Sequence, residues 1–375
     1  MTISSILIAN RGEIAIRISR AAAELGLRSV AIYAQDDQPS LHTRVADQAV
    51  ALDGTGVRAY LDIDAVVEAA RASGCDAVHP GYGFLAERAD FADCVEKAGL
   101  TFIGPKPEHL RLFGNKADAR AAAEAAGVAV INGISDAVTL DEAHAFFEGL
   151  PAGRKMIIKA LAGGGGRGTR AVSEADELPA AFERCQSEAL AAFGREDVFV
   201  EELMAPARHV EVQIVADHAG GVAHLGEREC SVQRRYQKVI EVAPAPFLAP
   251  EVRAGLTDAA VRFARAVGYS SLGTFEFLID EAGDFAFIET NARLQVEHTV
   301  TEAVTGVDLV QTQISIANGE SLGDLGLTDA GFAPRGFAIQ ARVNMESVEA
   351  DGTVRPSQGT LSVYEAPSGP GVRTD

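Results

Sequence analysis

The sequence predicts an α/β fold followed by an α+β region, and two patterns predict it. In about the first 105 residues, short apolar runs alternate with helical patterns, which is typical of an open parallel sheet covered by helices. Later in the chain, apolar runs cluster or alternate in the manner of antiparallel strands. We therefore expect a Rossmann-like N-terminal domain, a second domain with its own sheets, and the start of a β-rich third domain.

The first region alternates strand and helix from its beginning. A buried strand over 3–9 is followed by apolar residues at helical spacing up to Gly26, which ends the pattern. The turn between them reads Asn10-Arg11-Gly12-Glu13 and lacks the GxGxxG motif that binds a dinucleotide pyrophosphate. The sequence therefore does not support a dehydrogenase function. Further strands are expected at 29–34, 77–79 and 101–104, with helices at 62–72 and 84–98.

The second region changes in character. An alanine-rich helix over 117–126 leads to an apolar strand at 156–160, which runs into a glycine-rich stretch. After Pro334, strands are expected at 337–343 and 360–364. The predicted domains are residues 1–115, 116–334 with a mobile lid at about 132–203, and 335–375 as an incomplete third domain. Within the second domain we expect strands at 199–204, 210–216, 273–279 and 285–290, and helices at 175–192 and 250–267.

Length and charge exclude several classes of protein. The chain has 375 residues, enough for two or three domains, and its 33 basic and 53 acidic residues give a formal charge of −20. That sign disfavours partners such as nucleic acid or an anionic membrane. No apolar run is long enough to span a membrane and no signal peptide is evident, so we expect a cytoplasmic protein. The four cysteines form no CxxC pair and are expected to be buried thiols.

The glycine run Gly163-Gly164-Gly165-Gly166-Arg167-Gly168 is the most conspicuous motif. Successive glycines allow several backbone N–H groups to converge on one phosphate. No GK[ST] follows the run, so it is not a P-loop. A flexible hairpin is the alternative to a phosphate-binding lid.

Only six of the 33 basic residues are lysines. A lysine retained among so many arginines suggests a site that needs a compact charge on a phosphate or another small anion. Lys116, Lys159 and Lys238 are the candidates, and Lys159 lies in an apolar strand beside the glycine run. Solvated surface lysines are the alternative.

Two glutamates could form a metal site. If Ala282-Gly283 is a two-residue turn, Glu276 pairs with Glu289 across a hairpin. Two facing carboxylates with phosphate nearby suit Mg²⁺. A three-residue turn would place them on opposite faces, barring a bulge, and leave two solvated glutamates.

Two polar segments remain. In 289–298, Arg293 could clamp a small oxyanion and Glu297 could take its proton, although a helix-cap network is the alternative. The segment 227–238 is a basic cluster in an acidic chain, which suits an anionic substrate or a salt-bridged loop.

Together these segments resemble biotin carboxylase, a family of ATP-grasp enzymes. The resemblance extends along the whole chain, in order and with similar spacing. It is carried by the motifs IANRGEIAIRI (8–18), HPGYGFLAE (79–87), FIGPKPEHLRLFGNK (102–116), IIKALAGGGGRGTR (157–170), RHVEVQI (208–214), ERECSVQRRYQKVIEVAPAP (227–246), GTFEFL (273–278) and ETNARLQVEHTVTE (289–302).

The resemblance implies a role for each matching residue. Glu297 matches the base that deprotonates bicarbonate, and Arg342 matches the group that stabilises the biotin enolate; with Arg293 and Lys238 they form the implied catalytic set. The implied ATP-binding residues are Lys116, Lys159, Gly164, Gly165, Gly166, Glu201, His209, Gln233 and Leu278. The implied metal ligands are Glu276, Glu289 and Asn291, the bicarbonate site is Lys238, Arg293, Gln295 and Val296, and the biotin-binding residues are Tyr82 and Arg342.

The implied reaction uses ATP, Mg²⁺ or Mn²⁺, and bicarbonate. Bicarbonate attacks the γ-phosphate of ATP to give carboxyphosphate, and the ureido nitrogen of biotin is then carboxylated. The chain has no Met-Lys dipeptide, so biotin is expected on a separate carrier protein or domain, with a carboxyltransferase as a further partner and a homodimer or larger complex. The final acyl acceptor does not follow from the sequence.

The sequence departs from the family pattern at several uncharged positions and at its end. Family members continue past the position of Asp375 to complete a β-rich domain. Another ATP-grasp carboxylate ligase and an ATP-binding module without turnover are the alternatives. The departures are Thr169, Tyr236, Thr290, Ala292 and Thr299.

Overall fold

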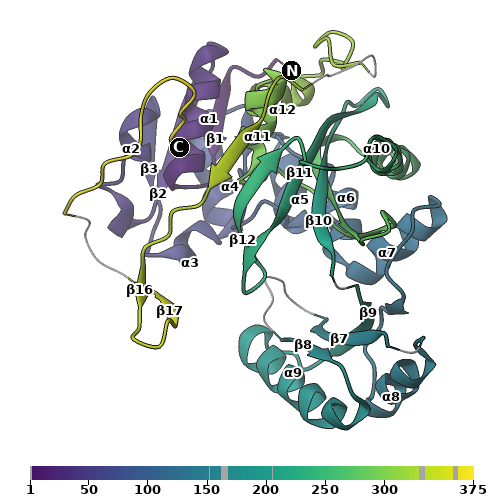
Figure 1. The fold of residues 1–375 in the computed structure, drawn as a ribbon. Coiled ribbons are helices and arrows are strands. Elements are labelled where there is room, and N and C mark those ends of the chain that lie inside the picture. The colour runs from purple at the N-terminus through teal and green to yellow at the C-terminus, as the bar shows by residue number, and fades with distance from the viewer. Residues whose placement is uncertain (1, 152, 162–167, 205, 329–333, 358–361) are drawn as a thin grey trace.

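The computed structural model describes residues 2–151, 153–161, 168–204, 206–328, 334–357 and 362–375. Figure 1 shows an N-terminal α/β layer beside a large central sheet, with a small lobe below them. The small lobe comprises the four-stranded sheet of β6 to β9 and its helices. This confirms the predicted fold class: a parallel N-terminal sheet, then antiparallel or mixed sheets, then a short C-terminal pair of strands.

The N-terminal sheet is parallel, with strand order β3-β2-β1-β4-β5. Its centre, β1, is buried throughout because both faces are covered. Helix α1 begins at Gly12 and packs Ile14 and Ile18 into the core. The strands are β1 (Ser5–Ile8), β2 (Arg28–Tyr33), β3 (Gln48–Ala51), β4 (Ala77–His79) and β5 (Thr101–Phe102). The helices are α1 (Gly12–Glu24), η1 (Gln35–Asp37), α2 (His42–Val45), α3 (Val57–Tyr60), α4 (Ile63–Ala72), α5 (Ala89–Lys97), α6 (Pro107–Gly114) and α7 (Lys116–Ala125).

One predicted helix is shorter than expected. The pattern over 84–98 predicted a single helix, but α5 begins only at Ala89. Gly81, Gly83 and Phe84 have φ values of 65°, 66° and 41°, and this left-handed backbone prevents a helix there. The prediction of helix over 84–88 was therefore wrong.

The small lobe is built on β6 (Gly133–Ile134), β9 (Val198–Leu203), β7 (Lys155–Ala160) and β8 (Thr169–Val172), in that order. Helices α8 (Leu140–Gly149) and α9 (Leu178–Phe193) cover the sheet, and η2 (Ala175–Glu177) precedes α9. Thr139 caps α8 and exchanges hydrogen bonds with Glu142 in a capping box. Of the glycine run, Gly164, Gly165 and Gly166 lie outside the described residues.

The central sheet has the order β14-β13-β10-β11-β12-β15, and every pair in it is antiparallel. The segment 227–238 is not a loop: it forms most of the β11–β12 hairpin, whose turn residues Arg235 and Tyr236 have φ values of 53° and 62°. Helix α10 (Pro250–Ala266) packs on this sheet, and α11 (His298–Thr305) and α12 (Leu309–Ala317) follow it. The strands are β10 (Arg208–Ala216), β11 (Val222–Arg234), β12 (Gln237–Ala243), β13 (Ser271–Ile279), β14 (Phe285–Asn291) and β15 (Ala338–Ala341).

The C-terminal residues form little regular structure. β15 pairs with β12, and a separate hairpin joins β16 (Glu346–Val348) to β17 (Val354–Pro356). The strand predicted at 360–364 is not found: 360–361 lie outside the described residues, and 362–364 form no strand. Phe337 and Ile339 beside and within β15 are 70% and 71% exposed, so this edge of the sheet is apolar and uncovered.

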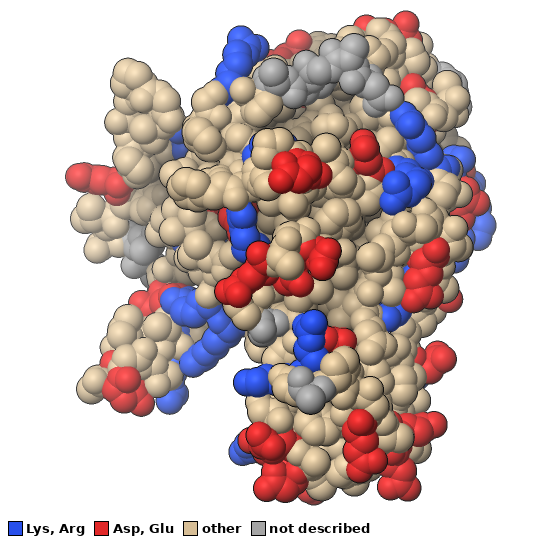
Figure 2. Space-filling model, turned by 45° about the vertical axis from the view of Figure 1, so that its right-hand side comes forward, with Lys and Arg blue, Asp and Glu red and all other residues tan. Residues whose placement is uncertain are grey.

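The cysteine prediction is confirmed for three residues. Cys75, Cys185 and Cys230 are buried and Cys94 is half-buried, and all four thiols are free. Of the described helices, none is long and apolar enough to cross a membrane. Acidic side chains are spread over the visible face, most densely on the small lobe (Figure 2).

Candidate active site

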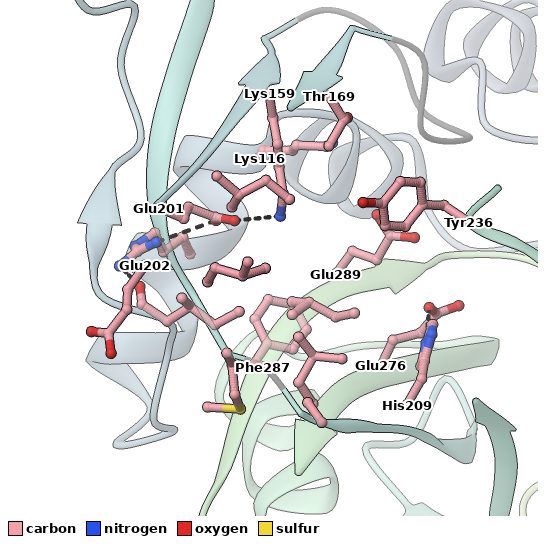
Figure 3. Close-up of a pocket in the computed structure, with 18 of the residues that line it drawn as sticks. Lys116, Lys159, Thr169, Glu201, Glu202, His209, Tyr236, Glu276, Phe287 and Glu289 are labelled. Carbon is pink, nitrogen blue, oxygen red and sulfur yellow. Dashed lines mark hydrogen bonds and ion pairs between the residues drawn. The ribbon is translucent and has the colours of Figure 1, made fainter. Parts of the chain in front are cut away.

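A cavity of about 550 Å³ separates the central sheet from the small lobe. Its lining comes from both sides: Lys159 and Glu201 from the lobe, and Glu276 and Glu289 from the central sheet (Figure 3). The mixture of apolar walls and a few converging charged groups is typical of a ligand site. Tyr236, one of the departures from the family pattern, also lines it. The predicted site residues in its wall are Lys116, Lys159, Glu201, His209, Gln233, Glu276, Leu278 and Glu289.

Two lysines line the cavity, Lys159 on β7 of the lobe and Lys116 at the start of α7. Lys159 forms an ion pair with Glu201 on the neighbouring strand. The ammonium groups of Lys159 and Lys116 lie 5.9 Å and 5.8 Å from the centre of the Phe199 ring. Both lysines are thus held by one aromatic ring, which is consistent with a compact cationic site for phosphate.

On the sheet side, Glu276 pairs with Glu289, as predicted, but by a different route. The connection is not a two-residue turn: Asp280 and Asp284 close a loop of three residues, and near the loop Phe277 pairs with Phe287. That register alone would place the two glutamates on opposite faces. However, the ladder contains a bulge: Ile288 on β14 has no partner on β13. The extra residue shifts the register by one and places Glu289 opposite Glu276.

The pairing continues across the sheet. Glu276 also pairs with Glu211 on β10, and Glu211 pairs with Arg228 on β11. Three carboxylates therefore lie in one row with a guanidinium at its end. Adjacent like charges repel, so cations are required around the row.

Glu276 is buried and accepts hydrogen bonds from four side chains. His209 Nε2 is 2.6 Å from one oxygen, and Lys238 Nζ, Asn291 Nδ2 and Gln295 Nε2 are 2.8, 2.7 and 2.9 Å from the other. Burial alone would raise the pKa of Glu276, but the charges of Lys238 and His209 hold it well below its ordinary value.

The donor set fits a hard divalent cation. Glu289 is exposed to the cavity, and the surrounding protein atoms and the negative charge of Glu276 raise its pKa. A cation between the two carboxylates would relieve that repulsion, and oxygen donors such as these suit Mg²⁺. His209, Glu211 and Glu276 also lie close enough together to share one ion.

Lys238 forms ion pairs with three carboxylates of the site. Its ammonium lies 2.5 Å from Glu211, 2.8 Å from Glu276 and 2.9 Å from Glu297. Burial by itself lowers the pKa of a lysine, but the three carboxylates raise that of Lys238 well above its ordinary value. Lys238 therefore carries a permanent positive charge beside the row.

The Glu297 side chain contacts two cationic residues and does not cap a helix. Glu297 is the N-cap residue of α11, yet its side chain makes no cap hydrogen bond and instead contacts Lys238 and Arg342 at 2.9 and 3.0 Å. Burial raises the pKa of Glu297, but the charges of Lys238, Arg228 and Arg342 outweigh burial and lower it. The carboxylate is therefore ionised near neutral pH.

The other predicted anion-binding residues lie around this pair. Arg293 Nη2 donates to Asn291 at 2.6 Å, and its Nε lies 3.1 Å from Glu87. Gln295 is buried and Val296 half-buried in the turn before α11. Gln233 contacts Nδ1 of His209 at 2.7 Å, which orients the imidazole toward Glu276.

Tyr82 lines a second cavity of about 430 Å³, together with Asn10 and Phe84. Its hydroxyl donates to Glu13. Burial and the charge of Glu13 raise the pKa of Tyr82, while the nearby Arg342 opposes that rise. Tyr82 and Arg342, the two predicted biotin-binding residues, thus lie close enough for the charge of Arg342 to act on the Tyr82 hydroxyl.

Glu211 and Glu241 were not among the candidates from the sequence, and Arg228 stood there only within the basic cluster 227–238. Glu211, Arg228 and Glu241 are fully buried and bind Lys238 or Arg342, or each other. The available signal was a charged residue inside an apolar strand pattern, as in RHVEVQI.

Comparison with known proteins supplies the family. Residues 2–110 match the model described as "Biotin carboxylase, N-terminal domain", and residues 115–325 match "Carbamoyl-phosphate synthase L chain, ATP binding domain". The chain is 49% identical over its whole length to the mitochondrial pyruvate carboxylase of Rattus norvegicus, but covers only 32% of that protein. It is 46% identical to a pyruvate carboxylase subunit of Methanothermobacter thermautotrophicus, with 99% of this chain and 74% of the relative covered.

A solved structure agrees in fold. The biotin carboxylase domain dimer of Hydrogenobacter thermophilus 2-oxoglutarate carboxylase, solved with MgADP, ADP and bicarbonate, matches with a TM-score of 0.91 and 40% identity. The match covers 98% of this chain and 80% of that one. The ligands of that structure are the nucleotide, metal and anion expected for this chain.

Proposed function

Because this chain belongs to the biotin carboxylase family, whose members are ATP-dependent ligases, we propose that it carries out the first half-reaction of a biotin-dependent carboxylase. ATP and bicarbonate give carboxyphosphate and ADP; the carboxyl group then replaces the proton on the ureido nitrogen of biotin, and phosphate is released. The observation that carries the proposal is the Glu297 carboxylate, kept ionised between Lys238 and Arg342 and beside the glutamate row.

ATP would occupy the large cavity. Its phosphates would meet Lys116 and Lys159, with Glu201, His209, Gln233 and Leu278 as further contacts. Gly164, Gly165 and Gly166 are proposed to close over the phosphates as part of a lid at about 132–203. The proposed domain boundaries remain 1–115, 116–334 and 335–375.

Glu276, Glu289 and Asn291 would hold Mg²⁺ or Mn²⁺. When bound, the ion supplies positive charge that neutralises the phosphate oxygens. The protein's own contribution is to fix the two carboxylates opposite each other, through the bulge at Ile288.

Bicarbonate would bind against Lys238, Arg293, Gln295 and Val296. Glu297 then takes the proton from bicarbonate, and a positioned base of this kind contributes about 10²–10⁴-fold in rate. Arg342 can stabilise negative charge on the biotin ureido oxygen, because it already faces Glu297 and Glu241 and carries a permanent charge. Tyr82 would contact the biotin ring.

The partners are proposed from the relatives. Biotin arrives on a carrier protein or domain, a carboxyltransferase follows, and the chain forms a homodimer or a larger complex. Pyruvate is the proposed acceptor, because pyruvate carboxylases from several organisms match the chain at 46–50% identity. The four free thiols support a reducing compartment such as the cytoplasm.

The test measures ATP hydrolysis with and without bicarbonate and free biotin. We expect turnover that requires bicarbonate and is lost in Glu297→Ala but retained in Glu108→Ala, a change at an exposed glutamate outside the site. Turnover that ignores bicarbonate but responds to another carboxylic acid would contradict the proposal. ATP binding without turnover would indicate a nucleotide-binding module.

A further inference from the structure

Arg228 is the most completely bonded side chain of the site, although it touches neither cavity. It is fully buried at the centre of β11. Its Nε pairs with Glu211 at 2.5 Å; Nη1 donates to Gln213 and Thr301 at 2.8 and 2.9 Å, and Nη2 to Thr274 and Gln295 at 3.0 and 3.1 Å. All five donors of the guanidinium are therefore used.

Two of these bonds lead directly to the reacting groups. Gln295 accepts from Arg228 through Oε1, which turns its Nε2 toward Glu276 at 2.9 Å. Glu211 gives one oxygen to Arg228 and the other to Lys238. Arg228 thus decides which way the Gln295 amide points and how the carboxylate beneath Lys238 is oriented.

The remaining bonds join the elements that carry the site. Thr274 lies on β13 with Glu276, and Thr301 lies on α11, which begins just after Glu297. A lysine at this position keeps one charge and three donors, and cannot span all of these partners. The planar fork of arginine is therefore what the arrangement requires.

We propose that Arg228 is a positioning residue for bicarbonate, acting through Gln295 and through the Glu211–Lys238 pair. This inference rests on the proposed function, since Gln295 and Lys238 are the groups proposed to bind bicarbonate. Arg228 itself contacts no substrate.

The variant Arg228→Lys tests the proposal while keeping the buried charge. We expect the KM for bicarbonate to rise about 10–100-fold, the usual effect of losing a supporting partner, with the KM for ATP changed less than about threefold. A double-mutant cycle with Gln295→Ala is the second measurement. If Arg228 acts partly through Gln295, the two losses in kcat/KM for bicarbonate are less than additive in free energy.

The matched control is Arg253→Lys. Arg253 pairs with Glu227, the residue before Arg228 on β11, so the control breaks a glutamate pair on the opposite face of the same strand. We expect it to lower the melting temperature without a selective change in the KM for bicarbonate. If Arg228→Lys is too unstable to assay, Thr274→Val and Thr301→Val each remove one hydrogen bond of Arg228. Each should raise the KM for bicarbonate more than the KM for ATP, but by a smaller factor than Arg228→Lys.

The outcomes separate the two proposals. If the unmodified protein shows no bicarbonate-dependent turnover, the proposed function is wrong. The positioning role is wrong if the protein turns over but Arg228→Lys lowers only the maximal rate, as a loss of folded protein would. It is also wrong if Arg228→Lys changes both KM values equally, as a general distortion of the site would, or if its loss in kcat/KM adds fully to that of Gln295→Ala.

Discussion

At the scale of single residues, the ionisation of Glu297 depends on its cationic neighbours. Burial favours the protonated acid, and the positive charges of Lys238, Arg228 and Arg342 overcome it, so its pKa is lowered. Replacing Arg342 by Met removes one of these charges, and the pKa of Glu297 then rises. A base must be ionised to act. As the pH is lowered, the variant will therefore lose activity at a higher pH than the unmodified protein does.

The measurement is the pH profile of kcat/KM for bicarbonate from pH 4 to 8, corrected for the fraction of substrate present as bicarbonate, in Arg342→Met and in the unmodified protein. We expect the acidic limb to move toward higher pH in addition to a fall in the plateau. The control is Arg293→Met, because Arg293 is not among the main charges acting on Glu297. A plateau that falls with no movement of the limb would contradict the electrostatic role of Arg342.

His79 is predicted to make the fold sensitive to acid. It is fully buried, and burial together with the charge of Arg17 lowers its pKa to about 3. Below about pH 6.5 the unfolded chain takes up a proton at His79 that the folded chain does not, so stability falls as pH decreases, by at most about 1.4 kcal/mol per pH unit for this group.

Denaturant unfolding of His79→Gln at pH 7 and pH 5 checks this. The variant is expected to lose stability at pH 7, because Nδ1 of His79 accepts from the Gly81 N–H, but to show a smaller further loss at pH 5 than the unmodified protein. His144→Gln, at a half-buried histidine on α8, is the control. An equal loss at pH 5 in both proteins would show that His79 remains protonated when folded.

At the scale of elements, the bulge at Ile288 determines whether two carboxylates face each other. Inserting one alanine after Ile288 would place Glu289 opposite Phe275 and turn it to the other face of the sheet. Deleting Ile288 would remove the bulge but leave Glu289 opposite Glu276. We expect the insertion to abolish Mg²⁺-dependent nucleotide binding and the deletion to weaken it much less.

Calorimetric titration with MgADP measures the difference between these two variants. Both change the length of β14 by one residue, so each serves as the control for the other. Equal loss of binding in both would mean that the bulge itself, rather than the pairing of Glu276 with Glu289, is required.

This element also shows where prediction from sequence ends. The strands of the central sheet were predicted because apolar runs mark buried strands in any context. The pairing of Glu276 with Glu289 was predicted from a two-residue turn, but the loop has three residues. The two glutamates pair because of a bulge at Ile288, which no local sequence pattern predicts. Residues 84–88 were misassigned because their apolar spacing suits a helix, whereas Gly81, Gly83 and Phe84 adopt left-handed backbone.

The charged site was predictable in part for the same reason. All four charged residues stand in motifs: Lys238, Glu297, Arg228 and Glu211. However, the importance of Arg228 comes from partners on β10, β13 and α11 and in the turn before α11. Such partners are known only when the sheet order is known. A charged residue inside an apolar strand pattern indicates that a buried ion-pair network exists, but it does not show which residues take part.

At the scale of the whole molecule, a formal charge of −20 opposes the approach of ATP. Cations that line the cavity, such as Lys116 and Lys159, attract ATP, and salt screens them less than the exposed carboxylates. Raising ionic strength from 0.01 to 0.15 M shortens the screening length from about 30 Å to about 8 Å. We therefore expect the KM for ATP to fall about twofold rather than rise.

Steady-state kinetics in KCl at constant free Mg²⁺ provide the measurement. The control is the pair Glu148→Lys and Glu183→Lys on the small lobe, which together change the formal charge from −20 to −16 because each reversal adds two. That double variant should show a weaker dependence on salt. A KM that rises with salt in both proteins would mean that the cavity cations dominate at long range.

The distribution of the four thiols has a practical consequence for spectroscopy. Cys94 on α5 is half-buried, while the other three are enclosed in the protein. A maleimide dye would therefore react first with the N-terminal layer, without any prior cysteine removal. A second cysteine introduced at the exposed Glu183 of α9 would then make a donor–acceptor pair, which would report whether the small lobe changes its distance from the N-terminal layer during turnover.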